Sequence, residues 1–391
     1  MSVRPTEEVL STARVALSAE LGREVVLDEP VGLVSWDDRA AEVLRCRLEG
    51  SPSGESTTVI VKASNLGHGH VRREIAALRF LNEIPEADGL VPRLLAAAPD
   101  DDLMVISDLG PDDRWFARWV EGGARDEAAP IAPDVASAVA AFHAHQRAMA
   151  RLHGVTQGRL IRYEALLAEV APTESTRHRC WRLDEALRAL PDEVAPLLSS
   201  VPSELGRELT VIARVLDEPG PFLVLTHGDP TLANGQLDGR GEIVLFDLEA
   251  VAPRHALVDG SFAAFRYLHS MWARRLPSRL RKELQATYRA ELARWIPEAA
   301  DDALFEEALA ASCAAWLAGL LCLLPRALKQ DEEWNGPSLR QRVWAGLEHA
   351  AEMPGLSSRW PALAEVVENL LDRLGREWGP LAPLPGYRAL R

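Results

Sequence analysis

Asp229, Asn234 and Asp247 are three oxygen-bearing side chains whose spacing suits the binding of a cation. The dipeptide Asp238-Gly239 favours a hairpin turn, and Asn234 and Asp247 stand at similar distances on its two sides. We therefore expect Asn234 and Asp247 at the open end of one hairpin, where their oxygens can bind a hard cation. Asp229 lies five residues before Asn234, in the loop that enters the same site.

A carboxylate beside two metal-binding oxygens suits phosphoryl transfer from a magnesium nucleotide. The metal neutralises charge on the phosphates, while the free carboxylate of Asp229 orients and deprotonates an attacking hydroxyl. A cation against the phosphates is also required. Lys62 supplies it, because it ends an apolar strand-like run in a chain with 40 arginines and only three lysines. Glu74, on an amphipathic helix predicted over Val71–Leu81, is placed to pair with Lys62.

These residues resemble the aminoglycoside phosphotransferase and choline kinase superfamily, which consists of small-molecule kinases with a protein-kinase-like fold. The motifs that carry the resemblance are His227-Gly228-Asp229 with Asn234, then Asp247, and far upstream Lys62 and Glu74. The resemblance implies that Asp229 is the catalytic base and that Asn234 and Asp247 bind Mg²⁺. It also implies that Lys62 contacts the nucleotide phosphates, with Glu74 as its partner.

Three further features follow from the same resemblance. Ser107, Asp108 and Leu109 would form the hinge whose backbone meets the adenine of the nucleotide. Leu152-His153 matches the ending of the first helix of the large lobe, and Asp259 matches the aspartate that braces the catalytic loops. The expected phosphoryl donor is ATP, or GTP in its place, together with Mg²⁺.

The sequence departs from the family pattern in two loops. Thr231 and Ala233 stand where many relatives have histidine and glycine, and Pro230 follows the catalytic aspartate. The loop expected over the phosphates, Gly32–Asp37, contains one glycine. The similarity extends from about residue 20 to about residue 350, but its strong motifs lie within 222–265. The resemblance therefore does not identify the acceptor.

Two residues near the motif each have two interpretations. His227 either transfers protons or braces the loop through hydrogen bonds, and we favour the second. Glu249, two residues after Asp247, either assists the metal and substrate or braces the loop at the surface.

The pattern of apolar residues predicts strands early in the chain and helices later. Helical spacing marks the first thirty residues, and strand-like runs follow at Val43–Leu48, Thr57–Ala63 and Leu103–Ile106. After Pro111 the chain is mainly helical, apart from a strand, loop and hairpin over Phe222–Val251. The later helices are expected near 134–153, 160–170, 181–199, 203–217, 278–296, 301–328, 338–351 and 360–377.

This order of elements predicts an α+β, two-lobed, protein-kinase-like fold. We expect an N-terminal nucleotide-binding lobe over residues 1–108, with a leading helix within 1–30 and one key helix beside its sheet. The remaining residues, 109–391, would form a larger helical lobe for catalysis and substrate binding.

The composition of the chain limits the classes of binding partner and the cellular compartment that we expect. The chain has 391 residues with 43 basic and 58 acidic side chains, a net charge of −15, which argues against nucleic-acid binding. Its four cysteines form no Cys-x-x-Cys pair, which favours a reducing compartment over disulfides or zinc. The uncharged run Ala308–Leu324 is short of the ~20 strongly apolar residues of a spanning helix. We expect a buried helix there, no membrane partner and a cytoplasmic protein.

Together these features favour an ATP- and magnesium-dependent phosphotransferase acting on a hydroxyl of a small molecule, either an aminoglycoside-like antibiotic or an amino or sugar metabolite. One alternative is a metabolite kinase of the choline or sugar type, and another is a nucleotide-binding pseudokinase without turnover. Protein-kinase activity is disfavoured because the sequence lacks the His-Arg-Asp form of the loop and a following Ala-Pro-Glu segment. The sequence does not indicate an oligomeric state.

Overall fold

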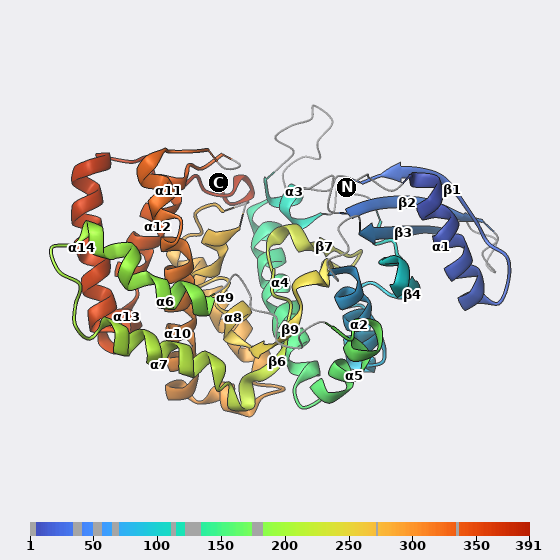
Figure 1. Cartoon of the computed structure of the whole chain (residues 1–391), viewed down its shortest axis with the longest axis horizontal. Coiled ribbons are helices and arrows are strands. Elements are labelled where there is room, and N and C mark those ends of the chain that lie inside the picture. The colour runs from blue at the N-terminus through green and yellow to red at the C-terminus, as the bar shows by residue number, and fades with distance from the viewer. Residues whose placement is uncertain are drawn as a thin grey trace.

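The computed structural model places a five-stranded antiparallel sheet at one end of the molecule and a larger, mainly helical part at the other (Figure 1). The predicted α+β, two-lobed class is therefore confirmed. The described residues are 5–33, 41–49, 57–64, 70–110, 115–121, 134–173, 183–270, 273–333 and 336–391. Most of the loop expected over the phosphates, residues 34–37 of Gly32–Asp37, lies outside them.

The sheet has the strand order β1-β2-β3-β5-β4, and every neighbouring pair is antiparallel. Its three central strands coincide with the three predicted runs, whereas the two edge strands were not predicted. One edge strand contains Asp28, Glu29 and Pro30, and the other is mostly alanine, so neither has the β-branched pattern of a strand. The strands are β1 (Val26–Gly32), β2 (Ala41–Glu49), β3 (Thr57–Ser64), β4 (Leu94–Ala98) and β5 (Leu103–Ser107).

Two helices cover opposite faces of this sheet. Side chains alternate along β3, so Val59 and Val61 face α1 (Thr6–Leu21) in one small hydrophobic core. Ile60 points the other way and joins the much larger core that contains α2 (His70–Asn82) and the helical part of the molecule. The helix predicted within residues 1–30 thus ends at Leu21, and the residues after it join the sheet.

The large lobe is built from the predicted helices, with some changes at their ends. The helix expected over 301–328 is divided in two, because a new helix with Pro325 in its first turn begins at Leu324 after α10. By length and composition the stretch Asp302–Lys329 could cross a membrane, but 72% of its apolar window is buried inside the protein, as expected for a core helix. The main helices are α3 (Phe116–Glu121), α4 (Val135–Thr156), α5 (Leu160–Val170), α6 (Leu183–Val194), α7 (Leu205–Asp217), α8 (Leu257–Gly260), α9 (Ser278–Leu292), α10 (Asp302–Leu321), α11 (Leu324–Lys329), α12 (Leu339–Ala351), α13 (Pro354–Arg359) and α14 (Pro361–Trp378).

Two small two-stranded sheets lie between the helices, at the junction of the lobes. The predicted hairpin is present, formed by β7 (Gly235–Leu237) and β8 (Ile243–Leu245). The predicted strand before the loop of Asp229 is β6 (Leu223–Thr226), and it pairs with β9 (Ala252–His255), which the sequence pattern did not reveal. These two pairings bring both ends of the segment 223–255 together, so the loop and the hairpin lie on a common base.

Candidate active site

The loop between β6 and β7 holds Asp229 and Asn234 in direct contact. The side-chain amide of Asn234 donates to the backbone carbonyl of Asp229 at 2.8 Å and to Oδ2 of its carboxylate at 3.0 Å. The backbone N–H of Asn234 donates to Thr231 O, which closes the turn between them. Because the amide nitrogen of Asn234 is engaged with Asp229, its amide oxygen is the atom left to bind a cation.

Gly228 allows this loop to pass close to the neighbouring segment. It has a φ of +83°, and a Cβ built on it would lie 2.2 Å from the carbonyl oxygen of Ala250. Its N–H donates to Oδ2 of Asp259 at 3.0 Å, and that carboxylate also lies 3.7 Å from Nε2 of His153. Asp259 and His153 are fully buried, so the loop is fixed from below by a rigid polar cluster.

The hairpin brings Asp247 to the same place. Phe246, the residue before it, donates its N–H to the carbonyl of Asn234 at 3.0 Å, so Asn234 and Asp247 lie at the open end of the hairpin as predicted. Asp247 has φ 63° and ψ 57°, a left-handed conformation that costs an L-residue about 1–2 kcal/mol. His227 accepts from the N–H of Asp229 through Nδ1 and faces Phe246 O through Nε2 at 3.0 Å. Both ring nitrogens therefore brace the loop, which supports the bracing interpretation of His227.

Lys62 links the sheet to this loop cluster. Its ammonium lies 2.7 Å from Oε2 of Glu74 on α2, as predicted, and 2.5 Å from Oδ1 of Asp247. Glu74 is almost completely buried, and its second oxygen accepts the N–H of Leu248 at 3.1 Å. Glu74 thus holds both Lys62 and the backbone next to Asp247.

The charges of this cluster shift one another's protonation. Burial opposes the charged form of Lys62, but the carboxylates of Asp247, Glu74 and Glu249 outweigh it and raise the pKa of the ammonium. Burial also opposes ionisation of Asp247, yet the neighbouring Lys62 holds the pKa of its carboxyl below the usual range. Partial burial, followed by the charge of Asp247, raises the pKa of Glu249 to about 7. Glu249 Oε2 lies 4.0 Å from the ammonium of Lys62, at the edge of the cluster.

The predicted hinge, Ser107–Leu109, follows the strand that pairs with β3: Ser107 stands opposite Val59, three residues from Lys62 along β3. The side chain of Asp108 is held by Arg45 of β2, with distances of 2.8 Å and 3.2 Å to the guanidinium. Gln236 donates to the carbonyl of Leu109 at 3.0 Å. The hinge backbone is therefore fixed from both lobes.

The donor set fits magnesium rather than a metal held by protein ligands alone. Among the described residues no group of three or more histidine, cysteine, aspartate or glutamate side chains could hold a metal ion. The site instead offers one amide oxygen from Asn234 and the carboxylate of Asp247, one oxygen of which already binds Lys62. Magnesium commonly uses one or two protein oxygens and completes its shell with phosphate oxygens and water.

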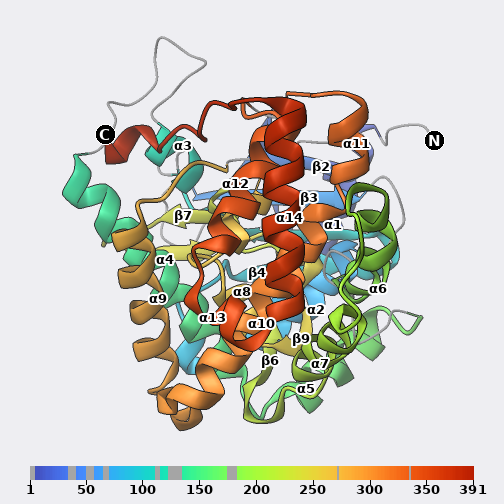
Figure 2. The same ribbon diagram turned by 90° about the vertical axis from the view of Figure 1, so that its left-hand side faces the viewer.

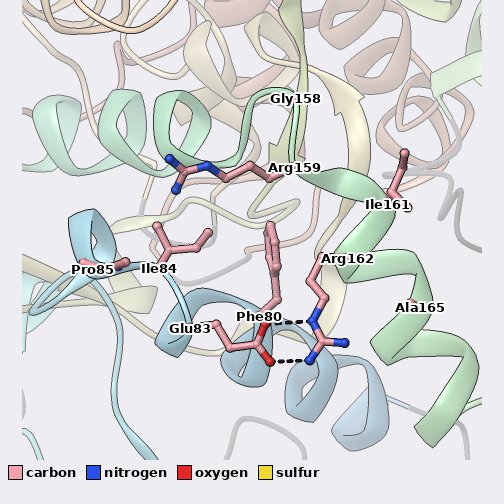
Figure 3. A pocket seen from close by; sticks show the side chains of 9 residues that line it. All are labelled: Phe80, Glu83, Ile84, Pro85, Gly158, Arg159, Ile161, Arg162 and Ala165. Atoms are coloured by element: carbon pink, nitrogen blue, oxygen red, sulfur yellow. Dashed lines mark hydrogen bonds and ion pairs between the residues drawn. The ribbon is translucent and has the colours of Figure 1, made fainter.

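A cavity of about 580 Å³ lies elsewhere, between α2 and α5, and none of its lining residues belongs to the site described above (Figure 3). Phe80 and Ile84 line it with apolar side chains, and the ion pair between Glu83 and Arg162 lies beside Phe80.

Residues 41–301 match the model of the APH phosphotransferase enzyme family, which is about two thirds of the chain. The chain belongs to this family. The predicted superfamily and the kinase-like class of the fold are thereby confirmed. The site residues lie within the matched range, whereas α1, β1 and all of α10–α14 lie outside it.

Solved structures similar to this chain include three enzymes, each with low identity. A macrolide 2′-phosphotransferase from Brachybacterium faecium is 14% identical, with 92% of this chain and 98% of that chain covered and a TM-score of 0.45. A choline kinase from Streptococcus pneumoniae is 12% identical, with coverages of 88% and 96% and a TM-score of 0.42. An ethanolamine kinase from Plasmodium vivax is 10% identical, with coverages of 88% and 80% and a TM-score of 0.47. No protein with a curated description matches this chain.

Sequence reasoning missed several residues that hold the site together. Arg254 donates to Thr226 Oγ1 at 2.8 Å and to Ala250 O at 3.0 Å, which ties the base of the loop of Asp229 to the segment after Asp247. Arg45 and Gln236 hold the hinge. Gln236 lies two residues after Asn234, and this spacing was a usable signal for its place in the first strand of the hairpin. No feature of the sequence near Arg45 or Arg254 indicates their distant partners.

Proposed function

We propose that this protein is an ATP- and magnesium-dependent phosphotransferase that acts on a hydroxyl of a small molecule. The observation that supports it most strongly is a chain of contacts in which Asn234 binds Asp229 and accepts the N–H of Phe246, the residue before Asp247. Asp247 in turn binds Lys62, which binds Glu74. A carboxylate, two metal-binding oxygens and an ammonium ion meet in one place, which is the set that phosphoryl transfer needs.

In this proposal each residue has one task. Asp229 accepts the proton of the acceptor hydroxyl as its oxygen attacks the terminal phosphorus of the nucleotide, and the nucleoside diphosphate leaves. Lys62, held extended by Glu74, binds the phosphates. The backbone of Ser107–Leu109 receives the adenine, with ATP as the donor and GTP as the alternative.

Asn234 and Asp247 would hold Mg²⁺, which when bound neutralises charge on the transferred group. Lys62 now occupies one oxygen of Asp247, so nucleotide binding exchanges part of this contact for one to phosphate. Positioning and charge neutralisation supply most of the rate, because the protein forms no covalent bond to the substrate.

We also propose the roles of the two lobes, the class of acceptor and the cellular compartment. Residues 1–108 bind the nucleotide, and residues 109–391 provide catalysis and the acceptor site. The acceptor is an aminoglycoside-like antibiotic or an amino or sugar metabolite, and the protein acts in the cytoplasm without a nucleic-acid or membrane partner.

The first test measures release of nucleoside diphosphate with a library of metabolites and antibiotics. Asp229→Asn is expected to lower turnover by about 10²–10⁴-fold, since it removes the general base. Binding of magnesium-ATP should be largely retained. Asp302→Asn, an exposed aspartate on α10, is the matched control and should turn over like the wild type. Near-wild-type turnover of Asp229→Asn with the true acceptor would show that the base assignment is wrong.

The second test separates the metal site from the base. Asp247→Ala should abolish the magnesium-dependent part of ATP binding, measured by calorimetry with and without the metal. Wild-type binding of magnesium-ATP without turnover of any library member would instead support the pseudokinase alternative. Failure of the wild type to bind ATP at all would contradict the proposal.

A further inference from the structure

A segment beyond the range of the family match returns from the far side of the large lobe to the helix that follows the hinge. This strap, residues 380–391, leaves α14 and ends beside α3 (Figures 1 and 2). Gln341 donates to Ala382 O at 3.0 Å, and the N–H of Arg275 donates to Pro385 O at 2.8 Å. These bonds fix the course of the strap across the large lobe.

The strap ends in a column of aromatic rings. Tyr387 meets Phe142 of α4 edge-on, with ring centroids 5.3 Å apart and planes at 64°. Phe142 meets Phe116 of α3 in the same way, at 5.3 Å and 67°. All three side chains are at most 1% exposed, so each ring has little room to move without displacing the next.

The inner end of this column supports the catalytic loop. A Cβ built on Gly235 would lie 3.9 Å from Cδ1 of Phe116, which places the Phe116 ring directly against the residue after Asn234. Trp115, the neighbour of Phe116, donates its indole N–H to the carbonyl of Ala233, the residue before Asn234. Asn234 is thus held on both sides by adjacent residues of one short segment.

We propose that the strap positions Asn234 through the ring column Tyr387–Phe142–Phe116 and the indole of Trp115. The assignment of Asn234 to the metal rests on the proposed function. The coupling from the strap to Asn234 does not depend on that function. These are positioning residues, because none of them touches a nucleotide or acceptor in the arrangement proposed above. Their effect is transmitted to Asp229 as well, since Asn234 donates two hydrogen bonds to that residue.

The matched variants are Tyr387→Ala, Tyr387→Phe and Phe305→Ala. The first removes the outer ring, and the second keeps the ring and loses only the hydroxyl. Phe305, buried at the start of α10 under Arg289, controls for the loss of an aromatic side chain from the same core. If Tyr387→Ala does not fold, Tyr387→Leu replaces it, because it keeps most of the volume but not the ring.

The first measurement is hydrogen exchange, which needs neither substrate nor activity. In Tyr387→Ala the amides of Asn234 and Phe246 should exchange about tenfold faster than in the wild type, since both bonds depend on the position of Asn234. Phe305→Ala should leave these two amides unchanged, and Tyr387→Phe should restore protection. Equal exchange in Tyr387→Ala and the wild type would overturn the proposal, whether or not the protein is a kinase.

The second measurement is the magnesium requirement of turnover. Tyr387→Ala should raise the magnesium concentration for half-maximal turnover by about fivefold, with little change in the KM for ATP. A merely structural loss would lower the amount of folded protein and leave this requirement unchanged, as expected for Phe305→Ala. A Tyr387→Phe variant as defective as Tyr387→Ala would show that the hydroxyl, not the ring column, acts on the site. A wild type without turnover would contradict the proposed function and leave the exchange result to decide on the strap.

Discussion

The two faces of the five-stranded sheet belong to different hydrophobic cores. The outer face packs against α1, and its core contains Val59 and Val61 with Leu44 and Cys46 of β2. The inner face, represented by Ile60 and by Met104 and Ile106 of β5, belongs to the same continuous core as α2 and the large lobe. The sheet therefore separates a small core that it forms with α1 from the large core that both lobes share.

This difference shows how the fold separates stability from chemistry within a single strand. Lys62 lies on the inner face, where Glu74 and Asp247 reach it from α2 and from the hairpin region. Val61, its neighbour, is fully buried on the outer face, where only α1 and the sheet meet. We therefore expect changes in the outer core to affect the candidate active site less than changes on the inner face.

The largest expected effects on turnover and stability come from substitutions of the neighbouring residues Lys62 and Val61. Lys62→Met leaves two carboxylates without their cation, so both stability and turnover should fall, the turnover by about 10²-fold or more. Val61→Ala leaves a cavity that lowers the free energy of unfolding by about 2 kcal/mol, while the turnover of the folded protein stays unchanged. Denaturant unfolding together with initial rates at low temperature measures both quantities.

A Val61→Ala variant with a large loss of turnover would contradict the separation of the two faces. Lys62→Met with normal turnover would contradict the assignment of Lys62 to the nucleotide phosphates.

The two cores also differ in their response to acid. Over the described residues the outer core contains no histidine, whereas the large lobe buries several, among them His255. Burial, assisted by His153, lowers the pKa of His255 to about 3. In the unfolded chain this histidine titrates near 6.5, so between these values the unfolded state binds more protons. The stability that neutral His255 contributes is complete above pH 6.5 and is lost as the pH falls toward 3.

We therefore expect His255→Asn to flatten the pH dependence of unfolding. Asparagine keeps an acceptor near the position of Nδ1, which receives the N–H of Leu257. The difference in unfolding free energy between pH 7 and pH 4 should shrink by about 3 kcal/mol relative to the wild type. Burial also lowers the pKa of His143, at a half-buried position of α4, so His143→Asn is the comparison and should shrink this difference in the same direction but by less. An unchanged slope in His255→Asn would show that His255 does not govern the acid response.

The elements with strong periodicity were predictable from the sequence, and the edges of the sheet were not. The run Thr57–Ala63 is β-branched and the spacing of Val71–Leu81 is helical, so each indicates one structure. Leu94–Ala98 consists of two leucines and three alanines, none of them β-branched, and it becomes a strand only because β5 offers a partner. Pairing with a distant strand is a tertiary effect that a local pattern does not record.

The relative positions of the site residues were predictable where their spacing along the chain determines them. The turn at Asp238-Gly239 fixed the relation of Asn234 to Asp247, and this part of the prediction is confirmed by the hairpin. The pairing of Lys62 with Glu74 is likewise present. The contacts of Arg45, Arg254 and Trp115 join segments far apart in the chain, so they required the structure. The catalytic and binding roles of the site residues stay predictions.

The inner face of the sheet also differs from the outer face because its helix, α2, is bound to the large lobe. Arg162 of α5 binds Glu83, just beyond the end of α2, with distances of 2.8 Å and 2.5 Å (Figure 3). Arg79 of α2 lies 3.1 Å from Glu169, at the other end of α5. Because these pairs join α2 to α5 rather than to the sheet, they hold Glu74 with the large lobe.

The smallest expected effect comes from reversing one of these pairs. Arg162→Glu places two carboxylates together at an exposed site, so the loss in kcat/KM for ATP should be small, at most about fivefold. Glu83→Arg should cause a similar loss, and the double variant should recover most of it, because the opposite charges meet again with exchanged positions. The control is the pair Arg279 and Glu283 on α9, where reversal should leave kcat/KM unchanged. If both single variants and the double variant have additive effects, the pair Arg162–Glu83 does not hold α2 in place, which leaves the pair Arg79–Glu169 and the apolar contacts between α2 and α5.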